Sequence, residues 1–102
     1  MFGALKGIQE LCYKNNAKFF LIILPSREAL YPNRFQKESI RLINLAENKA
    51  RALGIQYISL RKELEEKGGK KLYIDFCHPT AEGYSVIAEE LNAYFLKKLK
   101  NE

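Results

Sequence analysis

The stretch FFLIIL, which begins at Phe19 and ends at Leu24, constrains the fold more than any other part of the chain. Its six residues are all apolar, so a strand formed here would be apolar on both faces. Strands of this kind occur in parallel sheets that carry helices on both sides. Pro25 ends the run, because proline lacks the N–H that a strand donates to its neighbour. The stretch therefore predicts a buried strand in an α/β fold.

Helical periodicity and a second strand complete the pattern. Apolar residues at three- and four-residue steps predict amphipathic helices over residues 4–16, 36–53 and 80–99. Their apolar stripes consist of Leu5, Ile8, Leu11 and Cys12 in the first, Ile40, Ile43, Ala46, Ala50 and Leu53 in the second, and Tyr84, Ile87, Ala88, Leu91 and Phe95 in the third. The segment IQYISL predicts a second strand, KLYI is a weaker candidate for a third, RKELEEK predicts a charged turn of helix, and SREALYPNRF predicts a loop.

This order of elements predicts one α/β domain over residues 1–102, a partial three-layer α/β/α sandwich with two or three parallel strands and three main helices. Two strands leave both edges of a sheet open, and an apolar edge made of FFLIIL tends to pair with another chain. We therefore expect the strand from Phe19 to Leu24 to be covered, either by a missing N-terminal half of a longer protein or by a second copy in a homodimer. The isolated chain is expected to self-associate.

Composition and charge exclude more than they establish. No run of about 18 apolar residues occurs, so no membrane span is expected in this segment, and MFGALKGIQE lacks a signal-peptide pattern. The net charge is +5, but the basic residues are scattered and the run KKLK suits the last turn of a helix, which disfavours nucleic acid as a partner. Cys12 and Cys77 are expected to be free thiols, and one histidine with two distant cysteines is a poor metal ligand set. No cofactor is expected, and the compartment stays open.

The only histidine, His78, lies in the segment YIDFCHPTAEGY, three residues after Asp75. A D-x-x-H pair taken alone favours a surface carboxylate beside a turn histidine. Cys77 precedes the histidine directly, but adjacent side chains tend to point apart, which disfavours a thiol nucleophile paired with His78. Thr80 is a typical N-cap for the last helix. The interpretation of the pair therefore depends on the residues that follow it.

The longer segment YIDFCHPTAEGYSVIAEEL resembles the last conserved block of the SGNH hydrolases, also called the GDSL esterase/lipase superfamily. That block has the form D-x-x-H-P-[TN]-x-x-G-[YH]-x-x-[IL]-A, and the chain matches it at Asp75, His78, Pro79, Thr80, Gly83, Tyr84, Ile87 and Ala88. NKARALGIQYISL is similar to the helix–Gly–strand unit that precedes this block, and KNNAKFFLIILPS is similar to the strand two units back. The resemblance thus extends over nearly the whole chain, although only the last block is specific.

The resemblance implies a flavodoxin-like α/β/α fold and a role for each matched residue. His78 would be the general base that takes the proton from a serine hydroxyl and passes it to the departing alcohol, and Asp75 would orient its imidazole. Pro79 would fix the backbone after the base. Gly83 would let the last helix approach a neighbouring segment closely. The family's substrates are esters, so the partner implied is an ester substrate.

The family's other catalytic motifs do not occur in the chain. There is no Gly-Asp-Ser for the nucleophile and no Gly-x-Asn-Asp for the oxyanion hole, and Ser26 follows a later strand than the nucleophile would. The chain is therefore expected to be the C-terminal part of a lipase/acylhydrolase-like serine esterase, inactive alone. LPSREALYP also resembles a stretch in bacterial carbohydrate acyltransferases, which implies an acylated carbohydrate as a further substrate class. The alternative is a non-enzymatic α/β interaction module that dimerises through its apolar strand.

Overall fold

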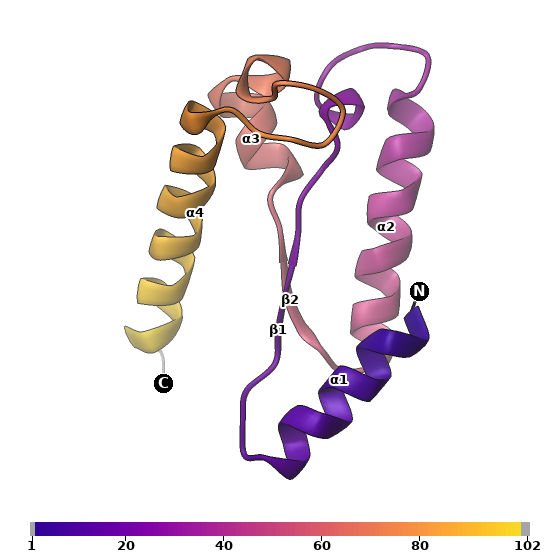
Figure 1. Cartoon of the computed structure of the whole chain (residues 1–102), viewed down its shortest axis with the longest axis vertical. Coiled ribbons are helices and arrows are strands. Elements are labelled where there is room, and N and C mark those ends of the chain that lie inside the picture. The colour runs from indigo at the N-terminus through magenta and orange to yellow at the C-terminus, as the bar shows by residue number, and fades with distance from the viewer. Residues whose placement is uncertain (1, 101–102) are drawn as a thin grey trace.

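The computed structural model describes residues 2–100 and contains helices on both sides of a pair of strands (Figure 1). In chain order the elements are α1 (Phe2–Lys14), β1 (Phe20–Ile23), the 3₁₀ turn η1 (Arg27–Leu30), α2 (Gln36–Ala52), β2 (Gln56–Ser59), α3 (Arg61–Lys67), the 3₁₀ turn η2 (Gly69–Leu72) and α4 (Ala81–Lys100). The three predicted main helices are thus present. The short helix predicted at RKELEEK is present as α3, and the loop predicted at SREALYPNRF contains the turn η1.

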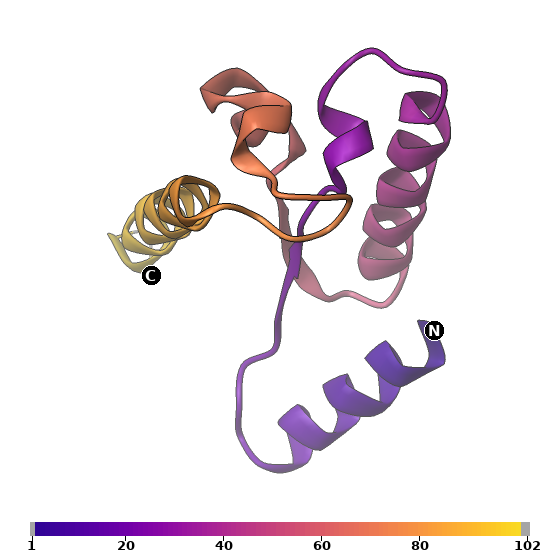
Figure 2. The ribbon, with the colours of Figure 1, turned by 45° about the horizontal axis from the view of Figure 1, so that its top comes forward.

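The two strands are parallel, and helices lie on both sides of the pair. The register runs from Phe20 opposite Gln56 to Ile23 opposite Ser59. Helices α2 and α4 lie on opposite sides of the strand pair (Figure 2). On the α4 side the ring of Phe20 contacts Tyr94 edge-on, with 5.4 Å between ring centroids, and Phe95 at 5.0 Å. The predicted α/β class is therefore confirmed, with the smaller of the two predicted strand numbers.

A third parallel strand does not form at KLYI. The turn η2 takes up Leu72, and Tyr73 makes only an isolated antiparallel bridge to Pro79. Gly69 has a φ of +60°, which starts a tight turn that an extended strand would not allow. The chain reverses here before α4 begins, so Tyr73 pairs with Pro79 and this segment does not run alongside β2. The sheet formed by residues 2–100 has two strands, and both are edge strands.

The largest buried cluster lies beyond the carboxyl ends of the strands. It joins η1, α3, η2 and α4 through Leu30, Leu60, Leu64, Leu72, Tyr73 and Ile87. A second cluster packs α2 on the sheet through Ile23, Ala29 and Ile43. Burial of these side chains away from water stabilises the folded chain by about 1.5–3 kcal/mol for each large aliphatic residue. The best-packed part of the fold is therefore the end where the loop with Asp75 and His78 emerges.

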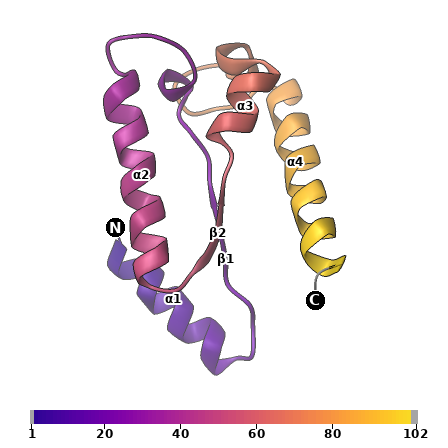
Figure 3. The same ribbon diagram turned by 180° about the vertical axis from the view of Figure 1, so that it is seen from behind.

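Two predicted apolar stripes are only partly buried. In α4, Ile87 is buried, but Tyr84 is 57% exposed and Ala88 is exposed, so their predicted burial is wrong. In α1, Leu11 is 62% exposed, and the helix runs obliquely past the lower end of the strand pair and does not lie along the strands (Figure 3). A sheet of two strands is too narrow to cover these faces. Between residues 2 and 100, no helix is both long and apolar enough to cross a membrane.

A pH dependence of stability follows from the burial of Tyr73. Its hydroxyl donates a hydrogen bond of 2.5 Å to the carbonyl of Pro25, and burial raises the pKa of Tyr73 to about 12. Between pH 10 and 12 the folded chain then holds a proton that the unfolded chain has lost, so the free energy of unfolding falls as pH rises. We expect a loss of about 2–3 kcal/mol across this window, measured by urea unfolding.

The variant Tyr73→Phe isolates this effect from the titration of other groups. It removes the hydrogen bond at every pH, so its unfolding free energy should be lower than that of the parent chain at pH 9, by about 1 kcal/mol. The difference between the two chains should then narrow and change sign toward pH 12. A difference that stays constant from pH 9 to 12 would contradict the assignment.

Candidate functional site

Asp75 and His78 lie in a narrow loop between η2 and α4. The amide of Ile74 donates to the carbonyl of His78 at 2.7 Å, and the amide of Thr80 donates to the carbonyl of Leu72 at 2.8 Å. These two bonds close the loop at its base and at its middle. The four residues 75–78 therefore form a tip that projects from the buried end of the fold.

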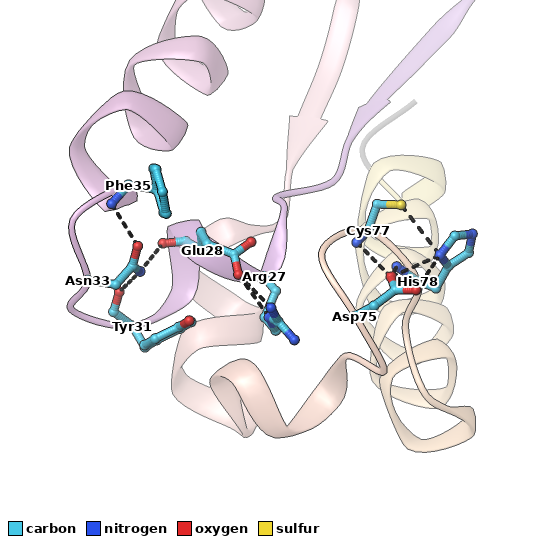
Figure 4. Close-up of polar contacts among 8 residues, drawn as sticks. All are labelled: Arg27, Glu28, Tyr31, Asn33, Phe35, Asp75, Cys77 and His78. Atoms are coloured by element: carbon cyan, nitrogen blue, oxygen red, sulfur yellow. Dashed lines mark hydrogen bonds and ion pairs between the residues drawn. The ribbon is translucent and has the colours of Figure 1, made fainter.

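The carboxylate of Asp75 holds the imidazole of His78, as the sequence predicts. Nδ1 of His78 lies 2.9 Å from Oδ1 and 3.1 Å from Oδ2 of Asp75 (Figure 4). Oδ1 also accepts the backbone amides of Cys77 at 3.0 Å and of His78 at 2.9 Å. A ring that donates from Nδ1 carries its lone pair on Nε2. The arrangement thus leaves Nε2 as the basic atom.

The charge of Asp75 is stabilised by the same contacts. The backbone amide of Cys77 is the largest cause of a lowered pKa for Asp75, followed by the His78 side chain and the His78 amide. The carboxylate therefore stays ionised to a lower pH than an ordinary aspartate. At neutral pH it is available to stabilise an imidazolium. Both side chains face solvent, with 68% of His78 and 55% of Asp75 exposed. The imidazole is therefore open to solvent over most of its surface.

The start of α4 anchors this loop. The amide of Gly83 donates to the hydroxyl oxygen of Thr80 at 3.0 Å, so Thr80 is the N-cap that the sequence predicts. A Cβ added to Gly83 would overlap the carbonyl oxygen of Leu72 and lie 3.0 Å from Cβ of Pro79. The predicted close approach at Gly83 is confirmed. The helix and the loop base are thereby held in direct contact.

The turn η1 supports the loop from the other side. The amide of Arg27 donates to the carbonyl of Phe76 at 2.9 Å, and its guanidinium pairs with Glu28 at 2.8 Å. Asn33 closes the following turn: its side chain donates to the carbonyl of Glu28 and accepts the amide of Phe35, both at 2.8 Å (Figure 4). Glu28 is only 7% exposed, and its Oε2 has no hydrogen-bond partner among residues 2–100.

A groove begins beside the loop and runs along α2. It has a volume of about 470 Å³ and is lined by Arg27, Glu28, Phe35, Glu38, Ser39, Leu42 and Phe76. A second hollow of about 260 Å³ shares Ser39, Leu42 and Phe76 with it and reaches the end of β1. Phe76, the residue between Asp75 and Cys77, connects the groove to the loop, whereas Asp75 and His78 do not line it. Sequence reasoning placed Glu28 in a loop and missed its burial, which no local pattern signals.

Neither Ser26 nor Cys77 supplies the nucleophile that the site lacks. Among residues 2–100, no serine hydroxyl hydrogen-bonds to His78, and this includes Ser26. Sγ of Cys77 lies 3.4 Å from Nδ1 of His78, so the expectation that these neighbours point apart is wrong. However, Nδ1 already donates to Asp75 and offers the thiol no lone pair. Cys12 and Cys77 are both free, as predicted.

No family model, curated protein or solved structure matches the chain. The site is therefore described by its own geometry. It consists of an ionised carboxylate and an oriented imidazole with an exposed edge, on a loop whose Phe76 lines a groove with apolar and charged walls. Such a pair can accept and return a proton, and it needs a separate nucleophile and a donor to an oxyanion to perform acyl transfer.

Proposed function

We propose that the chain is the C-terminal part of a serine ester hydrolase of the SGNH type and supplies its general base and orienting carboxylate. The observation that carries this proposal is the 2.9 Å contact between Oδ1 of Asp75 and Nδ1 of His78, with the imidazole exposed at the tip of the loop. The match of the surrounding residues to the family's last block adds to it. The nucleophilic serine and the oxyanion donors would come from an upstream segment or another chain.

The dyad acts in the same way in both half-reactions, acylation of the serine and hydrolysis of the acyl-enzyme. Nε2 of His78 removes the proton from the serine hydroxyl as its oxygen attacks the ester carbonyl carbon. The imidazolium, stabilised by Asp75, then gives this proton to the departing alcohol as the C–O bond breaks and an acyl-enzyme forms. Water attacks the acyl-enzyme by the same route, with Nε2 as base, and releases the acid and the serine.

The groove beside the dyad supports an ester as the substrate class. Phe35, Leu42 and Phe76 offer apolar contacts to an acyl chain. Arg27 and Ser39 at the same groove offer polar contacts to hydroxyl groups, such as those of an acylated carbohydrate. The substrate would enter along α2 and place its ester group at the tip of the 75–78 loop.

The open sheet supports a larger assembly around this chain. Both strands are edge strands, and Ile22 and Leu24 at β1 are exposed apolar residues. An unpaired apolar edge is a site for further strand pairing. We propose that an upstream N-terminal half pairs with β1 and brings the serine to His78. The second candidate is a non-enzymatic interaction module, a homodimer that pairs at β1 and has no serine nucleophile. The same open edge favours it.

A fluorophosphonate probe tests the proposed hydrolase. Its phosphorus forms a bond to an activated serine oxygen and releases fluoride, so the full-length protein should be labelled on one serine, and the isolated 102-residue chain should not. Because His78 activates that serine, His78→Ala should slow labelling by at least about 100-fold. The matched control Lys62→Ala, an exposed side chain on α3, should label at the parent rate.

Two outcomes would count against the hydrolase. The first is labelling of the full-length protein that persists at the parent rate in His78→Ala. The second is a full-length protein with no probe-reactive serine, and together with a stable dimer of the isolated chain it would favour the interaction module.

A further inference from the structure

Three different metal-ligating side chains meet at the tip of the loop before α4. The ligand atoms of Asp75, Cys77 and His78 all lie within 4.8 Å of one another. Sγ of Cys77 is 3.4 Å from Nδ1 of His78, and Nδ1 is 3.1 Å from Oδ2 of Asp75. All three side chains are exposed, so a cation can reach them directly from water.

Two of the three separations are close to those around a tetrahedral zinc ion. Bonds of about 2.3 Å to sulfur and 2.0–2.2 Å to nitrogen and oxygen place neighbouring ligand atoms about 3.3–3.6 Å apart. The sulfur and the ring nitrogen already have this separation, and the ring nitrogen and Oδ2 are a few tenths of an ångström closer. The carboxylate lies within 4.8 Å of the sulfur and would turn toward it on binding. The backbone amides of Cys77 and His78 hold Oδ1 of Asp75, which leaves Oδ2 for a metal.

We propose that this loop binds Zn²⁺ through Sγ of Cys77, Nδ1 of His78 and Oδ2 of Asp75, with water in the fourth position. A thiolate, an imidazole and a carboxylate form a mixed set that suits zinc better than magnesium or calcium. On binding, the thiol releases its proton to solvent. The ring changes tautomer: Nδ1 releases its proton to solvent and Nε2 takes one up, so the ring stays neutral. The oxidation state of every atom is unchanged.

The metal would also block the proposed reaction. With Nδ1 on the metal and the ring proton on Nε2, His78 has no lone pair for the serine proton, and Asp75 no longer orients the ring. Zinc would thus be a reversible inhibitor of the hydrolase. This consequence rests on the proposed function, whereas metal binding by the loop does not.

Titration with Co²⁺ tests the metal site without any activity assay. Co²⁺ bound to a thiolate gives an intense near-ultraviolet charge-transfer band, and we expect this band to saturate at one ion per chain and to disappear when Zn²⁺ is added. Cys77→Ser should abolish the band and weaken zinc binding by about 10-fold or more. The matched control Cys12→Ser, which changes the thiol of α1, should keep both. No band in the parent chain, or a band that survives Cys77→Ser, would overturn the proposal.

The inhibition is tested separately on the full-length protein. Zinc should inhibit ester hydrolysis, a chelator should restore it, and Cys77→Ser should need at least about 10-fold more zinc for half-inhibition, measured against its own zinc-free rate. Equal sensitivity of the parent and Cys77→Ser would overturn this role of the loop. A cobalt band at Cys77 in a protein without hydrolase activity would leave the metal site standing and reject the proposed function instead.

Discussion

Replacing Asp75 by asparagine is expected to lower kcat for ester hydrolysis by the full-length protein by about 10³–10⁴-fold. Asparagine keeps an oxygen that accepts the amides of Cys77 and His78, so the loop should keep its shape. It lacks the negative charge that holds the Nδ1 proton and stabilises the imidazolium. The ring would then spend most of its time in the wrong tautomer or orientation. Steady-state hydrolysis of a short-chain aryl ester measures the effect.

Two comparisons separate a catalytic cause from a structural one. His78→Asn should reduce kcat by a similar factor, and the double variant should be little worse than either single one, because the two residues act as a unit. Since both side chains are exposed, the free energy of unfolding should change by no more than about 0.5 kcal/mol in either single variant. The control Glu65→Gln, an exposed carboxylate on α3, should leave kcat unchanged. A loss of less than 10-fold in Asp75→Asn would remove Asp75 from the proposed dyad.

The contact between Asp75 and His78 was predicted from the resemblance, because the pair taken alone favours a surface carboxylate beside a turn histidine. The two residues are three apart in a turn that ends at an N-cap, so a few backbone dihedrals determine whether their side chains meet. The position of Cys77 depends on the same dihedrals, yet a general rule about neighbouring side chains gave the wrong result. At a loop tip, consecutive side chains can lie on the same side because the backbone is neither helical nor extended. The sequence shows which residues form such a tip, but the directions of their side chains depend on the backbone conformation of the turn.

The burial of Glu28 and the exposure of Tyr84 depend on contacts between distant parts of the chain. Periodicity shows which helix face is apolar, but it does not show whether a partner covers that face. In α4, the cluster that includes Leu30, Leu64 and Leu72 buries Ile87, and Tyr84 is left in water. Glu28 is buried because η1 packs against α3, η2 and α2, and a charged residue carries no local signal of such packing. These features follow from how the turns and helices pack together in the assembled fold, which no local pattern shows.

Replacing Gly83 by alanine is expected to destabilise the fold by about 3 kcal/mol, which corresponds to a fall in Tm of roughly 10–20 °C. The added methyl group would overlap the carbonyl oxygen of Leu72, a backbone atom that cannot move alone. That carbonyl also accepts the amide and the hydroxyl of Thr80, so α4 can retreat only by weakening its own N-cap. The gain of about 1 kcal/mol in helix propensity from alanine is too small to offset these losses. Thermal unfolding followed by circular dichroism measures the change.

The matched control is Gly7→Ala in α1, where an added Cβ meets no atom within 4 Å. Because only helix propensity acts there, this variant should keep or raise the Tm. The free energy of unfolding should rise by up to about 1 kcal/mol. Gly83→Ala should also disturb the loop that Thr80 and Pro79 connect to α4, so the NMR signals of the His78 ring should shift, while Gly7→Ala should leave them in place. Equal stability of the two alanine variants would mean that α4 does not lie against Leu72 in solution, and the anchoring of the dyad by this helix would have to be abandoned.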